Sequence, residues 1–537
     1  MSKIIVEKPN IKIHHILLSI LIIAIGIFWM SRKEDLDIDE VFTFGLANNT
    51  YQLDIEDFKE YDGNELLLHY AAVKDGEEFN VKNVFFNQKM DTHPPLYYLL
   101  VNFVSSIRKG TFSMWHGLII NLVFMLALFW EMQYFFNLII NDKLMSSIFS
   151  IIAFFTYGMI NEIVFIRMYV VLSVISMAFA ILIIEKIKSY QNNGINPYVT
   201  SLQFFLICVL GILTQYHFAI IALYFSIVFG LFLIYKKEFK TLFLIILSGA
   251  LSIVVSILIF PGMINHIFGE SSLHAVNGEQ IYSLSKKFFE ILRTVYRSFF
   301  GVGIIPYIFI LVIAIVLAII NLIKNKSNIK NVISNNKWFF ITLFACIFYY
   351  VAIPFTIKYT FARYLYNIYS LIIVCIISSI YLLFKSIKPM LKYISLVVII
   401  MLTITSRLNT QPFSLNVGNN KFYEFLKNNS DTKILALYRS KDKQGRFNSQ
   451  DTSLWKIQRP IYTFRAIKNI SFVDISSHPS IMYRSNDSIS NNNRLFILIY
   501  TDENDNEILS NIMQNNGFTN ISKIIDTTYY HMYLISK

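Results

Sequence analysis

Long apolar runs are the feature of this sequence that most restricts how the chain can fold. Residues 204–235 read FFLICVLGILTQYHFAIIALYFSIVFGLFLIY and contain no charged side chain. About twenty apolar residues suffice for a helix to cross the hydrocarbon core of a bilayer. Of the 537 residues, 55% are hydrophobic and 15% are charged, whereas a soluble domain usually has about 25% charged residues. The sequence therefore predicts a mainly α-helical, polytopic membrane protein.

Eleven apolar stretches are candidate membrane spans. Each is long enough for a transmembrane helix, or nearly so. Their approximate limits are 14–30, 113–138, 145–160, 168–186, 201–216, 218–235, 241–260, 303–323, 338–356, 366–384 and 391–406. No small-residue cleavage site follows the first stretch, so we interpret it as a retained anchor helix rather than a signal peptide.

The charges between the spans predict the orientation. Short basic connections, such as KKEFK at 236–240, are typical of the cytoplasmic side of a membrane protein. Segment 31–112 has fifteen Asp and Glu against eight Lys and Arg, which places it outside. With an odd number of spans, the N-terminus is cytoplasmic and the C-terminal tail extracytoplasmic. We predict a multi-pass protein of the plasma membrane. Its net charge of +12 reflects orientation, not a nucleic-acid partner.

The chain is predicted to have two domains. Residues 1–405 form the membrane domain, with 31–112 as its first extracytoplasmic loop. In the tail, 406–537, the runs TKILALY, RLFILIY and YYHMYLI read as strands, and NEILSNIMQNNGF reads as a helix that ends at Gly517. The tail is therefore predicted to be a small α/β domain. Within the membrane domain, residues 283–300 have the spacing of a helix lying in the membrane interface.

Acidic residues follow the first span directly, in the sequence DLDIDEVFTF. Asp39 and Glu40 stand there at the point where the chain leaves the lipid. An acid at such a low-dielectric boundary can serve as a base near neutral pH. Acids are also common in any outer loop, so this stretch alone leaves both interpretations open.

A second polar stretch, DTHPPLYYLL at 91–100, precedes an apolar run. Pro94 and Pro95 suit the first turn of a helix, so PPLYYLLVNFVSSI predicts a short helix at the membrane surface that ends near Arg108. Asp91 and His93 precede this helix, close to the positive end of its dipole. The alternative to a catalytic role is an anchoring helix with Asp91 as its cap.

These stretches resemble motifs of the GT-C glycosyltransferases, in particular the protein O-mannosyltransferase class, glycosyltransferase family 39, and relatives that transfer aminoarabinose to lipid A. The matching motifs are DE at 39–40, HPPLYY at 93–98, RMY at 167–169, TQYHF at 214–218 and ARY at 362–364. They occur in the family's order, all on the predicted outer face, over roughly the first 400 residues. The tail lies outside the resemblance, and the sequence has no β-trefoil insert, which favours a bacterial relative.

The resemblance implies an inverting glycosyltransferase with a GT-C-type bundle. It would move a sugar from a polyprenyl-phosphate donor to an envelope polymer, lipid or protein on the outer face. Asp39 would take the proton of the acceptor hydroxyl, and Glu40 and His93 would orient Asp39. The scheme requires no cofactor. Whether the outer acids also hold a divalent cation stays open, because their spacing matches no known ligand set.

The leaving phosphate needs positive charge, and the cations nearest the outer membrane boundary in the predicted topology are Arg167, Lys358 and Arg363. Arginine can bind a phosphate through two hydrogen bonds, whereas lysine acts as a point charge. Each of these cations has an alternative role as a snorkelling side chain at the end of a span. The residues expected to line the donor and acceptor sites are Asp91, Tyr97, Tyr169, Tyr216, His217 and Tyr364.

Two other functions compete with this interpretation. A transporter or flippase of lipid-linked sugars needs polar residues at mid-membrane depth, and the predicted spans contain few. A membrane-anchored binding protein would have its active part in the tail. The three cysteines, Cys208, Cys346 and Cys375, lie in apolar runs and are expected to be buried, without disulfides or metal. The sequence specifies neither the sugar nor the acceptor.

Overall fold

The computed structural model describes residues 13–50, 53–268, 283–300, 334, 336–357, 360–387, 389–409, 411–416, 419–441, 454–479, 487–501, 504–527 and 530–537. The chain folds into two compact units, and each unit contains three separate segments. Unit 1 consists of Met1–Arg32, Thr92–Tyr97 and Gly117–Leu415. Unit 2 consists of Lys33–Asp91, Tyr98–His116 and Asn416–Lys537.

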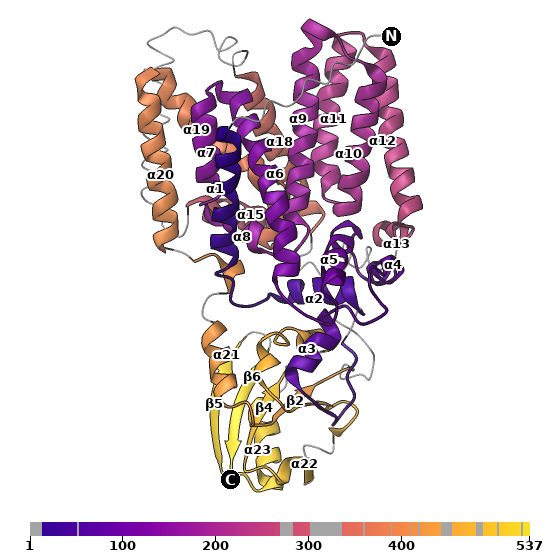
Figure 1. The fold of residues 1–537 in the computed structure, drawn as a ribbon, viewed down its shortest axis with the longest axis vertical. Coiled ribbons are helices and arrows are strands. Elements are labelled where there is room, and N and C mark those ends of the chain that lie inside the picture. The colour runs from indigo at the N-terminus through magenta and orange to yellow at the C-terminus, as the bar shows by residue number, and fades with distance from the viewer. Residues whose placement is uncertain are drawn as a thin grey trace. The chain divides into compact units, whose positions relative to one another are not determined.

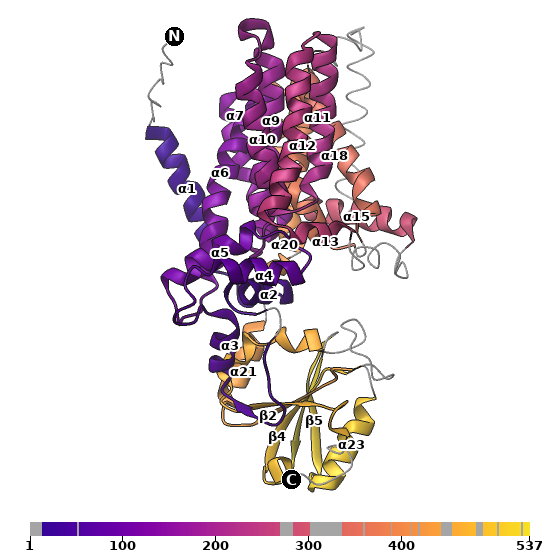
Figure 2. The same cartoon turned by 90° about the vertical axis from the view of Figure 1, so that its right-hand side faces the viewer.

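Long apolar helices build unit 1, and Figures 1 and 2 show α9 to α12 running side by side. Among the described residues, eight helices are long and apolar enough to cross a membrane, or nine spans with one bent pair. The long helices of this unit are α1 (Ile13–Met30), α6 (Trp115–Ile140), α9 (Tyr169–Asn193), α10 (Pro197–Thr214), α11 (Phe218–Tyr235), α12 (Phe239–Ile259), α18 (Lys337–Ala352), α19 (Tyr366–Ile387) and α20 (Lys392–Asn409). The predicted polytopic membrane fold is confirmed. The predicted span 303–323 lies outside the described residues.

The structure corrects the single span predicted at 145–160. Helices α7 (Lys143–Ala153) and α8 (Tyr157–Val164) meet at an angle of 65°. On α8, the Asn161 side chain accepts a hydrogen bond from the Ser414 backbone N–H at 2.9 Å. Glu162 beside it is fully buried. A break at membrane depth is tolerated where protein groups, rather than lipid, surround the freed polar groups.

Two shorter helices of unit 1 connect the long ones. They are α13 (Gly262–Phe268) and α15 (Leu284–Phe300). Helix α15 confirms the helix predicted at 283–300, and it packs against α8, α18 and α20. Its Phe289 and Leu292 side chains are exposed, as expected for a helix with an apolar outer face. The cysteines of α10, α18 and α19 are buried and free, as predicted.

A six-stranded sheet forms the centre of unit 2, in the order β1-β3-β2-β4-β6-β5. Strands β2, β3 and β4 are parallel, and β1, β5 and β6 pair with their neighbours in antiparallel orientation. The strands are β1 (Glu60–Tyr61), β2 (Ile434–Tyr438), β3 (Ile470–Asp474), β4 (Arg494–Ile499), β5 (Asn520–Asp526) and β6 (His531–Ser536). The central parallel strands are buried along nearly their whole length, as is usual for a sheet covered on both faces.

Helices cover this sheet on both faces. Helix α23 (Asp505–Asn516) packs its Ile508 and Ile512 side chains on Leu435 and Leu437 of β2, and Figure 2 shows it alongside the strands. On the other face lies α21 (Asn419–Asn428), whose Phe425 ring contacts Phe496 of β4. Short helix α22 (Asp487–Ser490) precedes β4. The strands and the helix predicted for the tail are confirmed, and Gly517 ends α23 with φ +75°.

The first loop joins the tail in unit 2, which differs from the predicted division after residue 405. Strand β1 comes from this loop and pairs with Ser471 and Ile470 of β3. The other loop elements are α2 (Ile38–Asn48), α3 (Gly63–Ala71), α4 (Val81–Met90) and α5 (Leu96–Ile107), of which all but the first two residues of α5 belong to unit 2. Backbone pairing between loop and tail is the physical reason for this arrangement.

Replacing Gly63 by Ala is expected to destabilise unit 2. A Cβ atom at Gly63 would lie 2.0 Å from the Phe464 carbonyl oxygen, and the Gly63 N–H donates to the Ile467 oxygen at 2.8 Å. Because the Phe464 backbone cannot move aside as a flexible side chain would, we expect the free energy of unfolding to fall by about 1–3 kcal/mol. Thermal unfolding in detergent measures it. Gly230→Ala is the control, since its Cβ would meet only Leu242 at 3.6 Å. Equal melting temperatures for the two variants would contradict the prediction.

Candidate functional site

Connections between helices at one end of unit 1 bring together residues that are far apart in the sequence. The segment before α5 carries His93, the α8–α9 connection carries Arg167, the α10–α11 connection carries His217, and the segment before α19 carries Tyr364. We call these four residues the rim cluster. All four were predicted as site residues from separate motifs.

The central contact of the rim cluster joins His93 and Arg167, 74 residues apart in the chain. The Arg167 Nη2 atom lies 3.5 Å from His93 Nε2. Arginine has only donors, so the imidazole nitrogen accepts in this contact. Arg167 is 4% exposed, although it carries a full charge. Because the side chain is buried, Arg167 does not snorkel into water.

Asn121 of α6 fixes the segment that carries Arg167. Its Nδ2 group donates to the Ile163 and Phe165 carbonyl oxygens at 3.1 and 2.8 Å, and its Oδ1 atom accepts from the Tyr97 hydroxyl at 3.1 Å. Asn121 is fully buried. Tyr97, predicted to line the site, therefore holds the start of α5 against the α8–α9 connection. No motif pointed to Asn121, but an amide side chain within an apolar span is a signal that could have found it.

Replacing Asn121 by Leu is expected to destabilise unit 1. Two buried carbonyl oxygens would lose their donor, at a cost of about 1–3 kcal/mol each. We expect a lower melting temperature in detergent, because the connection that carries Arg167 loses its support. Val123→Leu, at an exposed position of the same helix, is the control and should leave the melting temperature unchanged. Wild-type stability of Asn121→Leu would remove this residue from its supporting role.

Aromatic rings lie against His217 and Arg363. The His217 ring lies edge-on to Tyr364, with centroids 5.7 Å apart. Burial, together with the nearby His93, lowers the pKa of His217 to about 4, so this imidazole is neutral at physiological pH. The Arg363 guanidinium stacks over Phe361, with Cζ 4.4 Å from the ring centroid. Lys358, the third predicted cation, lies outside the described residues.

The other predicted tyrosines have structural contacts. Tyr169 stacks on Phe165, with centroids 6.0 Å apart, and meets Tyr366 edge-on at 5.5 Å. The Tyr216 hydroxyl lies 2.8 Å from Nδ1 of His266 on α13. These contacts pack α9 against α19 and fasten α13 to the α10–α11 connection.

Two buried charged residues near these connections were not predicted. Lys287 of α15 is 7% exposed, and its Nζ group donates to the Ile357 carbonyl oxygen at 2.6 Å. Glu162 of α8 accepts a hydrogen bond of 2.5 Å from the Ser173 hydroxyl. The sequence did not single out Lys287, because residues 283–300 are predicted to be an interface helix whose charged side chains face water. The amphipathic pattern does not reveal which lysine of a pair turns inward.

The acidic pair lies in unit 2, at the start of α2. Asp37 caps this helix by accepting from the Asp39 N–H at 3.1 Å, and the Asp37 N–H donates to Glu40 Oε2 at 2.7 Å. Glu40 also forms an ion pair of 2.9 Å with Lys33, and both side chains are fully buried. Glu40 thus stabilises the start of α2. Successive helix residues point about 100° apart, so Asp39 faces another direction.

Asp91 also belongs to unit 2. Its backbone N–H donates to the Asn87 oxygen at 3.0 Å, and it is the C-cap of α4. The sequence predicted Asp91 to line the site, with a cap for the helix that follows as the alternative. Its backbone instead ends the helix that precedes it, so that alternative is wrong. The short helix predicted after Pro94 and Pro95 is confirmed as α5, which starts at Leu96.

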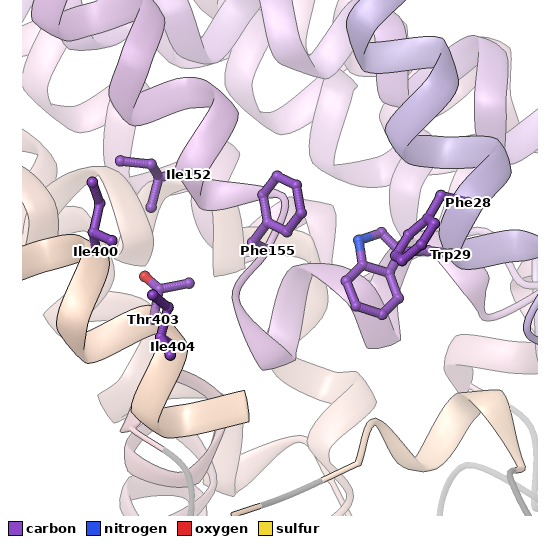
Figure 3. Close-up of a pocket in the computed structure, with 7 residues that line it drawn as sticks. All are labelled: Phe28, Trp29, Ile152, Phe155, Ile400, Thr403 and Ile404. Carbon is purple, nitrogen blue, oxygen red and sulfur yellow. The ribbon is translucent and has the colours of Figure 1, made fainter. Parts of the chain in front are cut away.

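Unit 1 also contains an apolar groove of about 450 Å³ between α1, the α7–α8 break and α20. Figure 3 shows the residues that line it: Phe28, Trp29, Ile152, Phe155, Ile400, Thr403 and Ile404. The Thr403 hydroxyl donates to the Ile399 carbonyl oxygen of its own helix, so the wall it offers is mainly apolar. The groove suits a hydrocarbon chain. Among the described residues, no group of three or more His, Cys, Asp or Glu side chains could hold a metal ion.

The comparison with solved structures agrees with this architecture. The chain resembles ArnT from Cupriavidus metallidurans, solved bound to undecaprenyl phosphate, with a TM-score of 0.51 and 8% identical residues. The match covers 97% of each chain. No protein-family model matches the sequence, and no curated protein matches it significantly. The chain therefore has an ArnT-like fold.

Proposed function

We propose that this GT-C-like chain is an inverting glycosyltransferase that moves a sugar from a polyprenyl-phosphate donor to an envelope acceptor on the outer face of the plasma membrane. The single observation that carries the proposal is the His93–Arg167 contact, because it unites two separate motifs around a buried cation. The fold shared with ArnT over 97% of both chains supports it. ArnT was solved with undecaprenyl phosphate, a lipid of the proposed donor class.

Arg167 and Arg363 would bind the donor phosphate. The Arg167 guanidinium can donate two parallel hydrogen bonds to phosphate oxygens, and its burial strengthens that attraction. His93 is a positioning residue that orients the guanidinium. His217 carries no charge at physiological pH and so adds no competing cation. The apolar groove in Figure 3 would suit the isoprenoid tail of such a donor.

Asp39 would act as the general base. As the acceptor oxygen attacks the anomeric carbon, its proton passes to the Asp39 carboxylate. A new carbon–oxygen bond forms, the bond to the phosphate oxygen breaks, and polyprenyl phosphate leaves as an anion. One displacement inverts the anomeric carbon. Phosphate leaves without protonation, so the scheme needs no acid and no cofactor.

Mass spectrometry of the cell envelope tests the proposal. A strain that lacks this protein should lose one glycan decoration, and the wild-type chain should restore it. Membrane vesicles should then form the same glycosidic bond from a polyprenyl-phosphate sugar. Movement of the lipid-linked sugar across sealed vesicles without any new glycosidic bond would instead establish a flippase. Activity of the isolated tail alone would establish a binding protein.

Replacing Arg363 by Ala is expected to weaken donor binding more than the chemical step. The loss of one charge-assisted hydrogen bond should raise the KM for the donor by about tenfold, with a smaller change in kcat. Initial rates at varied donor concentration measure both constants. Arg293→Ala is the matched control, because this exposed arginine of α15 pairs with Glu290 on the same helix. Unchanged donor kinetics in Arg363→Ala would refute this assignment.

A further inference from the structure

A second cavity of unit 1 lies away from the rim cluster, between α6, α9 and α10. Its volume is about 540 Å³. Its polar lining consists of Glu131 from α6, Glu185, Lys186 and Ser189 from α9, and Gln203 from α10. Ala178 and neighbouring apolar residues of α9 and α10 complete the walls. Neither the motifs nor the proposed transfer reaction uses any of these residues.

The cavity lies near the ends of its helices. Glu131 stands 140 − 131 = 9 residues before the end of α6, and Glu185 stands 193 − 185 = 8 residues before the end of α9. At about 1.5 Å per residue, these side chains lie about 12–14 Å from the helix ends. Tyr169 and the rim cluster are at the opposite end of α9. In the predicted orientation, the cavity lies within the cytoplasmic leaflet, below the headgroup region.

Glu131 is the residue of this cavity whose environment indicates a bound ligand. Its Oε2 atom is buried, and among the described residues it has no hydrogen-bond partner. A carboxylate within a membrane-spanning helix is costly unless a cation or a donor compensates it. Glu185 is already engaged by the Tyr134 hydroxyl and, at 3.4 Å, by Lys188. A ligand with N–H donors and positive charge would satisfy the remaining oxygen of Glu131.

Lys186 adds the opposite charge to the same cavity. A ligand that complements both signs carries an ammonium for the glutamates and an anion for the lysine. Phospholipids with an amine headgroup have both groups a few bonds apart. A quaternary choline has no N–H to give the Glu131 oxygen, and an anionic glycerol headgroup has no positive charge.

We propose that this cavity binds the headgroup of a zwitterionic aminophospholipid, with its primary ammonium toward Glu131 and Glu185 and its phosphate toward Lys186. The site would hold a structural or regulatory lipid in the leaflet opposite the rim cluster. It is independent of the donor site, so it stands whether or not the proposed transfer reaction is correct.

Native mass spectrometry of the purified full-length chain tests this inference. Phosphatidylethanolamine, phosphatidylcholine and phosphatidylglycerol with identical acyl chains are offered in turn, and we expect the first to bind most tightly. Glu131→Gln should weaken phosphatidylethanolamine binding by about tenfold, which corresponds to one charge-assisted hydrogen bond, and leave phosphatidylcholine unchanged. Equal binding of the three lipids by the wild-type chain, or undiminished phosphatidylethanolamine binding by Glu131→Gln, would overturn the proposal.

Two further variants separate binding from folding. Glu238→Gln is the matched control: this residue directly precedes α12, and its carboxylate accepts from the hydroxyl of Tyr190 on α9 at 3.0 Å, but it does not line the cavity. It should bind phosphatidylethanolamine like the wild type. Ala178→Phe fills the cavity while leaving every charge in place, so it should abolish selective binding. If Ala178→Phe folds normally and keeps that selectivity, the lipid binds elsewhere and the proposal fails.

Discussion

Replacing Asp39 by Asn is expected to reduce sugar transfer by about 10²–10⁴-fold, the usual contribution of a general base. The amide has nearly the same shape as the carboxylate but cannot accept the acceptor's proton. The local fold should survive, because the Asp39 backbone makes the contacts of this turn: its N–H donates to Asp37, and its carbonyl oxygen accepts from Thr43. Transfer from a polyprenyl-phosphate sugar in membrane vesicles measures the loss.

Asp75→Asn is the matched control for this variant. Asp75 belongs to the same loop, its side chain is 87% exposed, and it pairs with Lys109 at 3.2 Å. It should transfer sugar at the wild-type rate. Donor binding should be unchanged in Asp39→Asn, because the phosphate contacts belong to arginines. If Asp39→Asn keeps more than about a tenth of wild-type transfer with normal expression, Asp39 is not the base.

The membrane helices were predictable because each must bury or present an apolar surface over its whole length, and the sequence records this directly. The broken span was not, because Phe154 and its neighbours are as apolar as those of an unbroken helix. Just after the bend, Asn161 accepts a hydrogen bond from the Ser414 N–H, 253 residues away along the chain. No local pattern can reveal a bond to so distant a partner.

The sequence did not predict which segments make up unit 2, for a similar reason. The tail strands β2, β4 and β6 have strong apolar signals, but β1 has only two residues and lies in the first loop. Its pairing with β3 is a contact between segments about 400 residues apart. The predicted boundary therefore divides the chain at a single point in the sequence. In the structure, backbone pairing between β1 and β3 joins the first loop to the tail in one unit.

Only the site residues that belong to recognisable motifs could be predicted from the sequence. His93, Arg167, His217 and Tyr364 were named from separate motifs, and the structure brings them together. The motifs could not distinguish residues that face a ligand from those that hold the framework. Tyr97 proved to be bound to Asn121, and Glu40 to Lys33. Separating the two adjacent acids of α2 therefore requires experiments on both.

Replacing Glu40 by Gln is expected to destabilise unit 2 by about 3–5 kcal/mol, because it removes one charge of a buried ion pair. Both side chains are fully buried and lie 2.9 Å apart. Glutamine can still accept the Asp37 N–H, so the helix cap is kept and the charge alone is removed. Lys33→Met should cost a similar amount, since it removes the other charge of the same pair. Unfolding by heat or denaturant in detergent measures each change.

The double variant Lys33→Met, Glu40→Gln distinguishes a paired charge from simple loss of packing. With both charges gone, no ion is buried alone, and much of the lost stability should return. If the double variant is as unstable as the sum of the singles, the two residues act independently and the ion pair is not the cause. Glu40→Gln should fold poorly yet keep transfer per folded molecule, whereas Asp39→Asn should fold normally without transfer. These opposite outcomes at neighbouring positions would separate the structural carboxylate from the catalytic one.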